Sequence, residues 1–144
     1  MNAVDDTGGI VKEPSWELLL SDDLEQAAAK EHWRRVTTEM RERETLSASN
    51  AHAVQRLVLA YLLYDRCSRE VTESGPVLKP KRGNPKAIAR LSPYYTAMRD
   101  AGADAERMEA ELGLSPRQRN SAAKVQRKGK RTSASANYLK PVAQ

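Results

Sequence analysis

Cysteine is nearly absent from this sequence of 144 residues, since Cys67 is the only one. One cysteine cannot form an intrachain disulfide, so a secreted disulfide scaffold is excluded and we expect a cytosolic protein. A zinc site would have to combine Cys67 with His32, His52 and carboxylates. Because no Cys/His pair is closely spaced, we expect no metal site and no cofactor.

Aromatic side chains and long apolar runs are also scarce. The chain has no Phe, and aromatic residues make up 5% of it. No apolar run approaches the roughly 18 residues that a membrane span requires, and the polar, acidic beginning differs from a signal peptide. We expect a single small domain with no membrane partner. Its limited core favours association with copies of itself.

The sequence patterns typical of several enzyme classes are missing too. The chain contains neither G-x-x-x-x-G-K-[ST] nor G-x-S-x-G. His32 is expected to be a surface or packing residue, and Asp22 and Asp23 suit the positive end of a helix dipole. We therefore expect no catalytic residues and no enzymatic activity.

The charge of the chain, by contrast, is strongly uneven. Residues 1–74 hold 9 Lys and Arg against 14 Asp and Glu, whereas residues 75–144 hold 15 against 5, so the halves carry −5 and +10. This asymmetry predicts a polyanionic partner, or an acidic neighbour in an assembly. The predicted DNA-binding residues are Lys79, Lys81, Arg82, Arg117, Arg119, Lys124, Arg127, Lys128, Lys130 and Arg131.

Apolar periodicity predicts an all-α fold in three parts. Residues 1–14 are expected to be a flexible arm. Residues 15–114 form a helical oligomerisation core, with a basic Gly/Pro-rich loop at 75–92 that contains a short extended piece at Val77-Leu78. Residues 115–144 are expected to be a short basic helix and a disordered tail.

Two amphipathic helices joined by a short turn predict an antiparallel hairpin over residues 22–73. Asp22 and Glu25 match an Asp variant of the capping box at the start of the first helix. Ser49 or Asn50 suits the N-cap of the second. Trp16 to Leu20 is a short apolar patch that suits one helical turn.

A third long helix is predicted over residues 93–112. Ser92-Pro93 is typical of a helix start, with Ser at the N-cap and Pro at the first helical position. Gly113 is typical of the residue just after a helix end. Gly102 either permits a close approach of another helix or weakens this one.

Tyrosines and methionines at helical spacing are more typical of core or subunit packing than of base stacking. Arg34 and Arg35 are expected to pair with acids on their own helix, at Glu31, Glu39 or Glu42, rather than with phosphate. The predicted oligomer-interface residues are Trp33, Tyr61, Tyr64, Tyr95, Met98 and Met108.

Three stretches give the chain a resemblance to a known family. They are Ala29-Lys-Glu-His-Trp-Arg-Arg-Val36, the Ala60–Arg66 segment followed by Gly75-Pro-Val-Leu-Lys79 and Gly83-Asn84, and Glu111-Leu-Gly-Leu-Ser-Pro-Arg-Gln-Arg119. In this order and spacing they resemble small subunits of tailed-phage terminases, of the cohesive-end, lambdoid-like packaging group. The resemblance covers about residues 18–119. The segment 84–91 and Gly102 depart from the family pattern.

The resemblance implies a non-catalytic protein that forms rings and recognises phage DNA. Such proteins bring the large terminase subunit, which carries the ATPase and nuclease, to the packaging start site. We therefore expect three partners: double-stranded phage DNA, the large terminase subunit and further copies of this chain in a closed ring. The expected location is the host cytoplasm, in a transient packaging complex.

Two other binding functions fit the same residues. One is a dimeric helix-turn-helix regulator whose recognition helix would be residues 115–128. Against it, that helix is strongly basic and has few apolar residues with which to pack. The other is an RNA-associated protein that uses the same basic residues. A small enzyme is the weakest interpretation.

Overall fold

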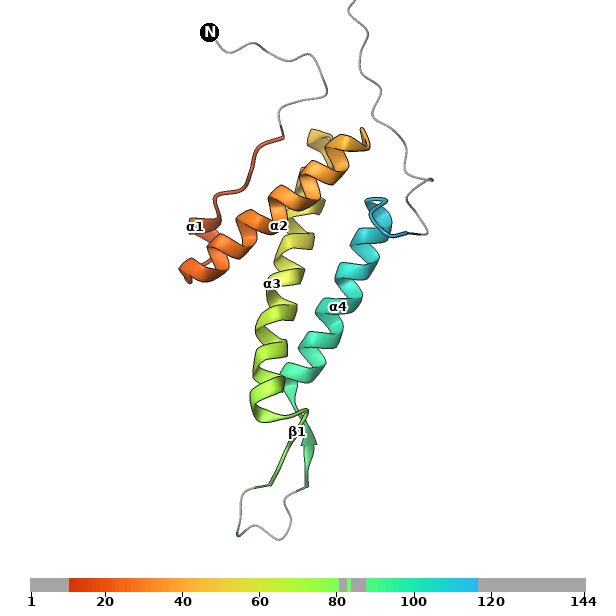
Figure 1. The fold of residues 1–144 in the computed structure, drawn as a ribbon. Coiled ribbons are helices and arrows are strands. Elements are labelled where there is room, and N and C mark those ends of the chain that lie inside the picture. The colour runs from red at the N-terminus through yellow and green to blue at the C-terminus, as the bar shows by residue number, and fades with distance from the viewer. Residues whose placement is uncertain (1–10, 81–82, 84–87, 117–144) are drawn as a thin grey trace, which may run out of the picture.

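A computed structural model of the protein describes residues 11–80, 83 and 88–116. In these residues the fold is helical, with one small pair of strands, so the predicted all-α class is confirmed (Figure 1). The elements in chain order are α1 (Trp16–Leu19), α2 (Asp23–Glu42), the 3-10 helix η1 (Ala48–Asn50), α3 (Ala51–Ser74), β1 (Val77–Leu78), β2 (Arg90–Leu91) and α4 (Pro93–Glu111).

Helix α2 begins where the sequence predicts, but only half of the expected capping box forms. The side chain of Asp22 accepts a hydrogen bond from the Leu24 amide at 2.9 Å. Glu25 does not close the box, because its carboxylate reaches Arg66 on α3. The turn after α2 has a capping box of its own, between Ser47 and Asn50.

Helices α3 and α4 lie side by side and antiparallel, and α2 crosses the N-terminal half of α3 obliquely (Figure 1). The most extensive helix contact is thus between α3 and α4, rather than within the hairpin expected over 22–73. The core gathers where the three long helices meet. Its buried members are Trp16, Ala29, Trp33, Val36, Met40, Val54, Leu57, Val58, Leu62, Ala105, Met108 and Leu112.

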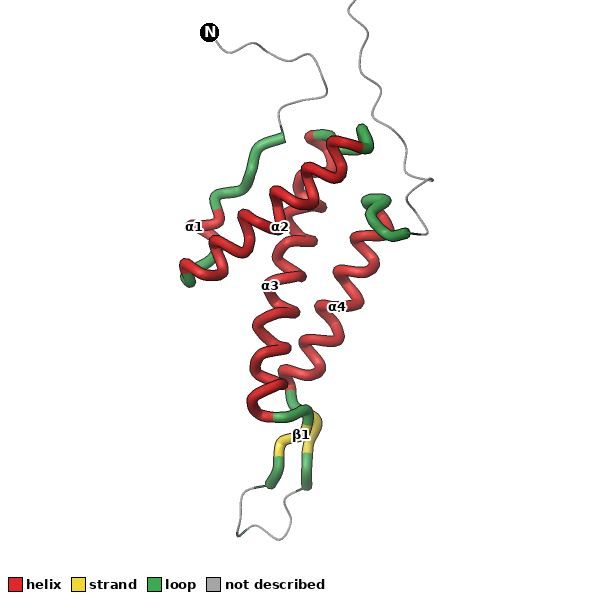
Figure 2. The backbone as a smooth tube through the Cα atoms, viewed as in Figure 1, coloured by secondary structure: helices red, strands yellow, loops and turns green. Residues whose placement is uncertain are grey.

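The loop between α3 and α4 contains an antiparallel ribbon at the far end of the helix pair (Figure 2). Val77 pairs with Leu91, and Leu78 pairs with Arg90. The extended piece at Val77-Leu78 is therefore confirmed. The second strand, Arg90–Leu91, was not predicted, because it is defined by its pairing with a segment more than ten residues away rather than by a local pattern.

Helix α4 ends in the way that Gly113 predicts. Gly113 adopts a φ of 72°, a conformation that glycine enters at little cost. The Leu114 amide donates to the Glu109 carbonyl at 2.8 Å, and the Gly113 amide donates to Ala110 at 3.1 Å, as in a Schellman motif. Arg43 at the end of α2 donates to the Gly113 carbonyl at 3.1 Å. The ends of α2 and α4 are thus tied together.

Gly102 permits a close contact between α4 and α3. A Cβ atom built at Gly102 would lie 3.4 Å from both Cδ2 and Cε2 of Tyr64. The ring of Tyr64 therefore rests over the glycine. Of the two interpretations of Gly102, the structure supports close approach.

Candidate nucleic-acid and subunit interfaces

Most of the predicted DNA-binding residues lie outside the described part of the chain. These are Lys81, Arg82 and the seven basic residues from Arg117 to Arg131. Lys79 is described, and it is exposed directly after β1. Of the predicted basic helix and tail at 115–144, the structure describes Ser115 and Pro116, and of the predicted arm at 1–14 it describes residues 11–14.

The described residues that border the two predicted basic clusters lie at opposite ends of the molecule. Lys79 stands at the ribbon, whereas Pro116 follows the far end of α4 (Figure 1). The 19 residues of α4 separate these ends by about 28 Å, at 1.5 Å per residue. The described residues next to the two clusters therefore lie far apart in one copy.

The predicted interface residues divide into three groups. Trp33 and Met108 are buried in the core of this chain, where Trp33 meets Trp16 edge to face at 6.1 Å between ring centroids. Their surface is already covered and is not available to another copy. Tyr61 is partly buried, and its hydroxyl donates to Glu109 at 2.5 Å. Tyr64, Tyr95 and Met98 retain partly or fully exposed side chains on the α3–α4 pair.

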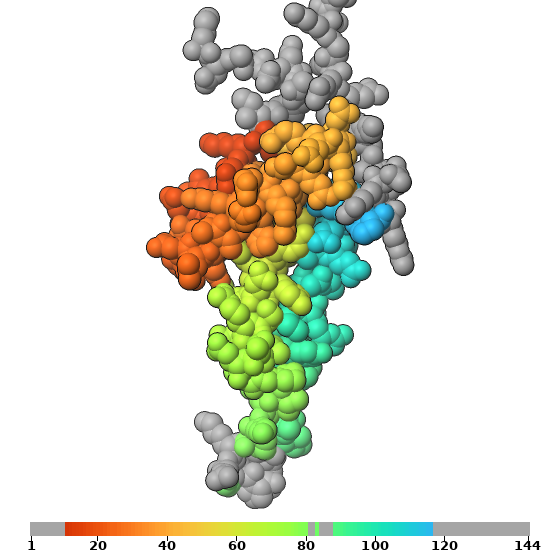
Figure 3. All heavy atoms as spheres, in the orientation of Figure 1, coloured from red at the N-terminus to blue at the C-terminus, as the bar shows by residue number. Residues whose placement is uncertain are grey.

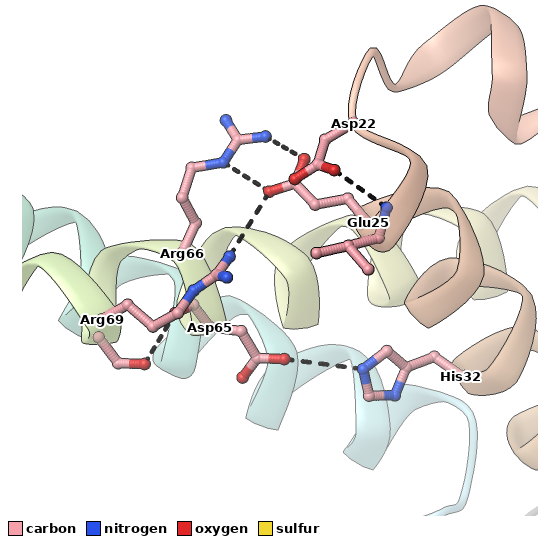
Figure 4. A network of polar contacts seen from close by, with 8 residues as sticks. Asp22, Glu25, His32, Asp65, Arg66 and Arg69 are labelled. Atoms are coloured by element: carbon pink, nitrogen blue, oxygen red, sulfur yellow. Dashed lines mark hydrogen bonds and ion pairs between the residues drawn. The ribbon is translucent and has the colours of Figure 1, made fainter.

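A polar network joins α2 to the C-terminal half of α3 (Figure 4). Arg66 donates through Nε and Nη2 to the two carboxylate oxygens of Glu25, at 2.8 and 2.5 Å. Arg69 lies 4.0 Å from the same carboxylate. The Glu25 side chain is 9% exposed, so the acidic partner of this ion pair is largely buried. The hydrogen bond from Arg66 lowers the pKa of Glu25, against burial, which raises it.

No signal in the sequence identifies Arg66 as the partner of Glu25. The two residues lie 41 positions apart, and Glu25 is well placed for a local capping role. The ion pair forms because the first turn of α2 lies beside the C-terminal half of α3 (Figure 4). Such a contact follows from the tertiary arrangement rather than from either helix alone.

His32 and Tyr61 form a second cluster at the α2–α3 contact. Their rings lie 5.1 Å apart, and the guanidinium of Arg35 lies 5.8 Å from the Tyr61 centroid. His32 Nε2 lies 3.8 Å from Asp65, as Figure 4 shows. Burial is the main cause that lowers the pKa of His32, and Asp65 opposes it. Burial and the hydrogen bond to Glu109 raise the pKa of Tyr61.

The paired arginines after Trp33 have different contacts. Arg34 binds Glu31 through two hydrogen bonds of 2.8 and 3.0 Å, which confirms the expected pairing within the helix. Arg35 instead contacts His32 Nδ1 at 3.1 Å and lies over Tyr61. A cation over an aromatic ring is a packing contact rather than a phosphate site.

The described residues show neither a metal-binding group nor a membrane-spanning helix. Within 11–80, 83 and 88–116, no three His, Cys, Asp or Glu side chains are grouped so that they could hold an ion. In the same ranges, no helix is both long and apolar enough to cross a membrane. Cys67 is buried against the helices.

In a comparison with known families, residues 29–129 match the family described as phage terminase, small subunit. The match spans well over half of the chain and extends through most of the basic stretch 117–131. No curated protein and no solved structure matches. The resemblance carried by the three sequence stretches is thus confirmed at the level of the family, while the cohesive-end grouping stays a prediction. The chain belongs to the phage terminase small-subunit family and has a role in phage packaging.

Proposed function

We propose that this chain is a DNA-binding ring protein that recognises the packaging site on the viral genome. It recruits and stimulates the large terminase subunit, which supplies ATP hydrolysis and DNA cleavage, and itself catalyses no reaction. The packaging complex forms transiently in the host cytoplasm. The observation that carries this proposal is the family match, which continues into the basic stretch 117–131.

The charge of the chain supports DNA as the ligand. Seven Lys and Arg residues lie between 117 and 131, with no Asp or Glu among them. DNA-binding proteins gain most of their non-specific affinity from such residues, through phosphate contacts that release counterions. Lys79, Lys81 and Arg82 supply a second set of phosphate contacts, which reach the DNA from another copy in the ring.

The large apolar side chains that one copy leaves exposed support assembly with further copies. Five of the ten exposed large apolar side chains in the described residues lie between residues 77 and 94, in the loop that carries the ribbon and in the first turn of α4. The five are Val77, Leu78, Ile88, Leu91 and Tyr94. Apolar surface of this extent is typical of a face that another protein covers.

The salt dependence of DNA binding tests the proposal. If one copy neutralises seven phosphates, a plot of log K against log salt concentration has a slope of about −6, at roughly −0.9 per phosphate. Replacing Arg127, Lys128, Lys130 and Arg131 with Ala then weakens binding to all sequences alike and makes the slope shallower by about 4. Competition between duplex DNA and RNA of equal length separates the terminase role from an RNA-associated one.

A matched control removes the same number of positive charges elsewhere. Lys30, Arg34, Arg41 and Arg107 are exposed residues of α2 and α4, and three of them form ion pairs with nearby acids. Their joint replacement with Ala is expected to leave the slope within about 1 of the unmodified protein. Equal losses in the two variants would mean that net charge alone, rather than the stretch 117–131, determines binding.

A further inference from the structure

The corner formed by α1 and the beginning of α2 exposes large apolar side chains. Leu18 is 86% exposed and Leu24 is 75% exposed, while Leu19 between them in sequence is about half exposed. Three leucines within seven residues thus face outward beside the buried Trp16. We call these three residues the corner.

A groove opens next to the corner, between α2 and α3. It has a volume of about 380 Å³, and Leu24, Ala28 and Leu62 line it together with polar residues. Leu24 therefore belongs both to the corner and to the groove. The combination offers apolar contact area and a recess that an apolar side chain can enter.

The surface around this groove is acidic. Besides the Glu25–Arg66 ion pair, the groove and the neighbouring hollow are lined by one further base, Arg69. The other acids on the two surfaces are Asp22, Asp65, Glu70 and Glu73. A partner that fits this site should therefore combine apolar side chains with positive charge.

The ribbon of the same protein has this combination. Val77, Leu78, Ile88 and Leu91 are all exposed large apolar residues. Arg90 is exposed beside them, and the sequence from 75 to 92 contains no Asp or Glu. We call these five residues the ribbon end.

The corner and the ribbon end lie apart on one copy, so neither can cover the other (Figure 3). We infer that the ribbon end of one copy docks on the corner and its acidic groove in the next copy. Such a contact joins two different surfaces, and its repetition closes a ring when the rotation between copies fits. The inference rests on the proposed ring and assigns the surfaces that form it.

Two single substitutions test the inference by native mass spectrometry of the full chain. Leu24→Asp places a charge at the corner, and Leu78→Asp places one at the ribbon end. Both residues are exposed, so each variant is expected to keep the helical circular dichroism of the unmodified protein. Each variant alone is expected to lose the assembly and to give the 16.0 kDa mass of one chain.

Mixing the two variants gives the most specific result. The corner variant keeps an intact ribbon end, and the ribbon variant keeps an intact corner. An equimolar mixture is therefore expected to form a complex of two chains that contains one of each and grows no further. A bismaleimide crosslink between Leu24→Cys and Leu78→Cys proteins detects the same contact if it is weak, since Cys67 is buried and the unsubstituted protein measures the background.

Leu63→Asp is the matched control, because Leu63 is an exposed leucine that lines a different groove between α3 and α4. It is expected to leave the assembly intact. The inference is overturned if the unmodified chain assembles and the Leu24→Asp and Leu78→Asp variants assemble equally well, or if the mixture gives neither the two-chain complex nor the crosslink. An unmodified chain that stays single would instead contradict the ring of the proposed function.

Discussion

The two ends of the α3–α4 pair differ sharply in what they bury. At the end where α2 crosses, Trp16, Trp33, Met40 and Leu57 are almost completely enclosed. Toward the ribbon, the buried residues of the described chain are the small ones Cys67, Ser92 and Ala101. The large apolar residues there are exposed or, like Tyr95 and Met98, partly exposed. We refer to these regions as the core half and the ribbon half.

The core half is the main source of the stability of one copy. Apolar burial contributes about 25 cal/mol per Å² removed from water, so the core half supplies most of the free energy that holds a copy together. In the ribbon half, little apolar surface is buried within one copy. In the proposed ring, that half gains its cover from a neighbouring copy.

Removing a large side chain from the core half is expected to have the largest effect. Trp33→Ala should lower the free energy of unfolding by about 3–5 kcal/mol, because it deletes the partner of Trp16 and leaves a cavity. Urea denaturation followed by circular dichroism measures the loss. Tyr94→Ala in the ribbon half, where the ring is about half exposed, should cost less than about 1 kcal/mol in a single copy. Equal costs would remove the distinction between the halves.

Breaking the ion pair between α2 and α3 is expected to have an intermediate effect. Arg66→Ala leaves the Glu25 carboxylate buried without its main partner, so we expect a loss of about 1–3 kcal/mol at pH 7. We expect no larger loss of stability, because the Arg66 side chain is about half exposed to water.

The pH dependence of that loss identifies its cause. Because the folded-state pKa of Glu25 is lowered from 4.5, the pair stabilises the fold above that pH and loses its contribution as the pH falls through the folded pKa. The difference between Arg66→Ala and the unmodified protein should therefore shrink in acid. The control Arg34→Ala, which breaks an exposed pair, should cost less than about 1 kcal/mol. An Arg66→Ala loss that is unchanged at low pH would mean that packing, rather than charge, is responsible.

Gly102 is expected to give the smallest effect, and one of opposite sign. Gly102→Ala should raise the free energy of unfolding by about 0.5 kcal/mol, because Ala is favoured in a helix and its Cβ fits at van der Waals distance from Tyr64. In a Tyr64→Ala background, where that ring is gone, the gain should approach about 1 kcal/mol. Thermal unfolding of the four proteins measures both gains. If Gly102→Ala lowered the stability instead, the Tyr64 side chain would be unable to move enough to accommodate the added methyl group.

Helix ends were the part of the fold that the sequence predicted best. Ser92-Pro93 and Gly113 bound α4 as expected, and Asp22 caps α2, because each acts through contacts within a few residues. The resemblance to terminase small subunits also came from sequence, through three motifs in a fixed order. Helix-end residues and the order of motifs can both be recognised from the sequence alone.

Contacts between distant residues could not be predicted in the same way. Glu25 is suited to a local cap, yet it pairs with Arg66, and Trp33 was expected at a subunit interface but packs on Trp16. The ion pair depends on how α2 lies against α3, and the ring contact depends on how α1 packs against α2. The predicted sites at Lys81, Arg82 and 117–131 stay predictions, since they lie outside the described residues.

The proposed ring can be tested by the native mass of the full chain at micromolar concentration. We predict a single closed species well above a tetramer, measured by native mass spectrometry and checked by light scattering. The exposed apolar residues of the ribbon half are then covered by neighbours. A monomer or dimer under the same conditions would contradict the ring and favour a dimeric DNA-binding regulator.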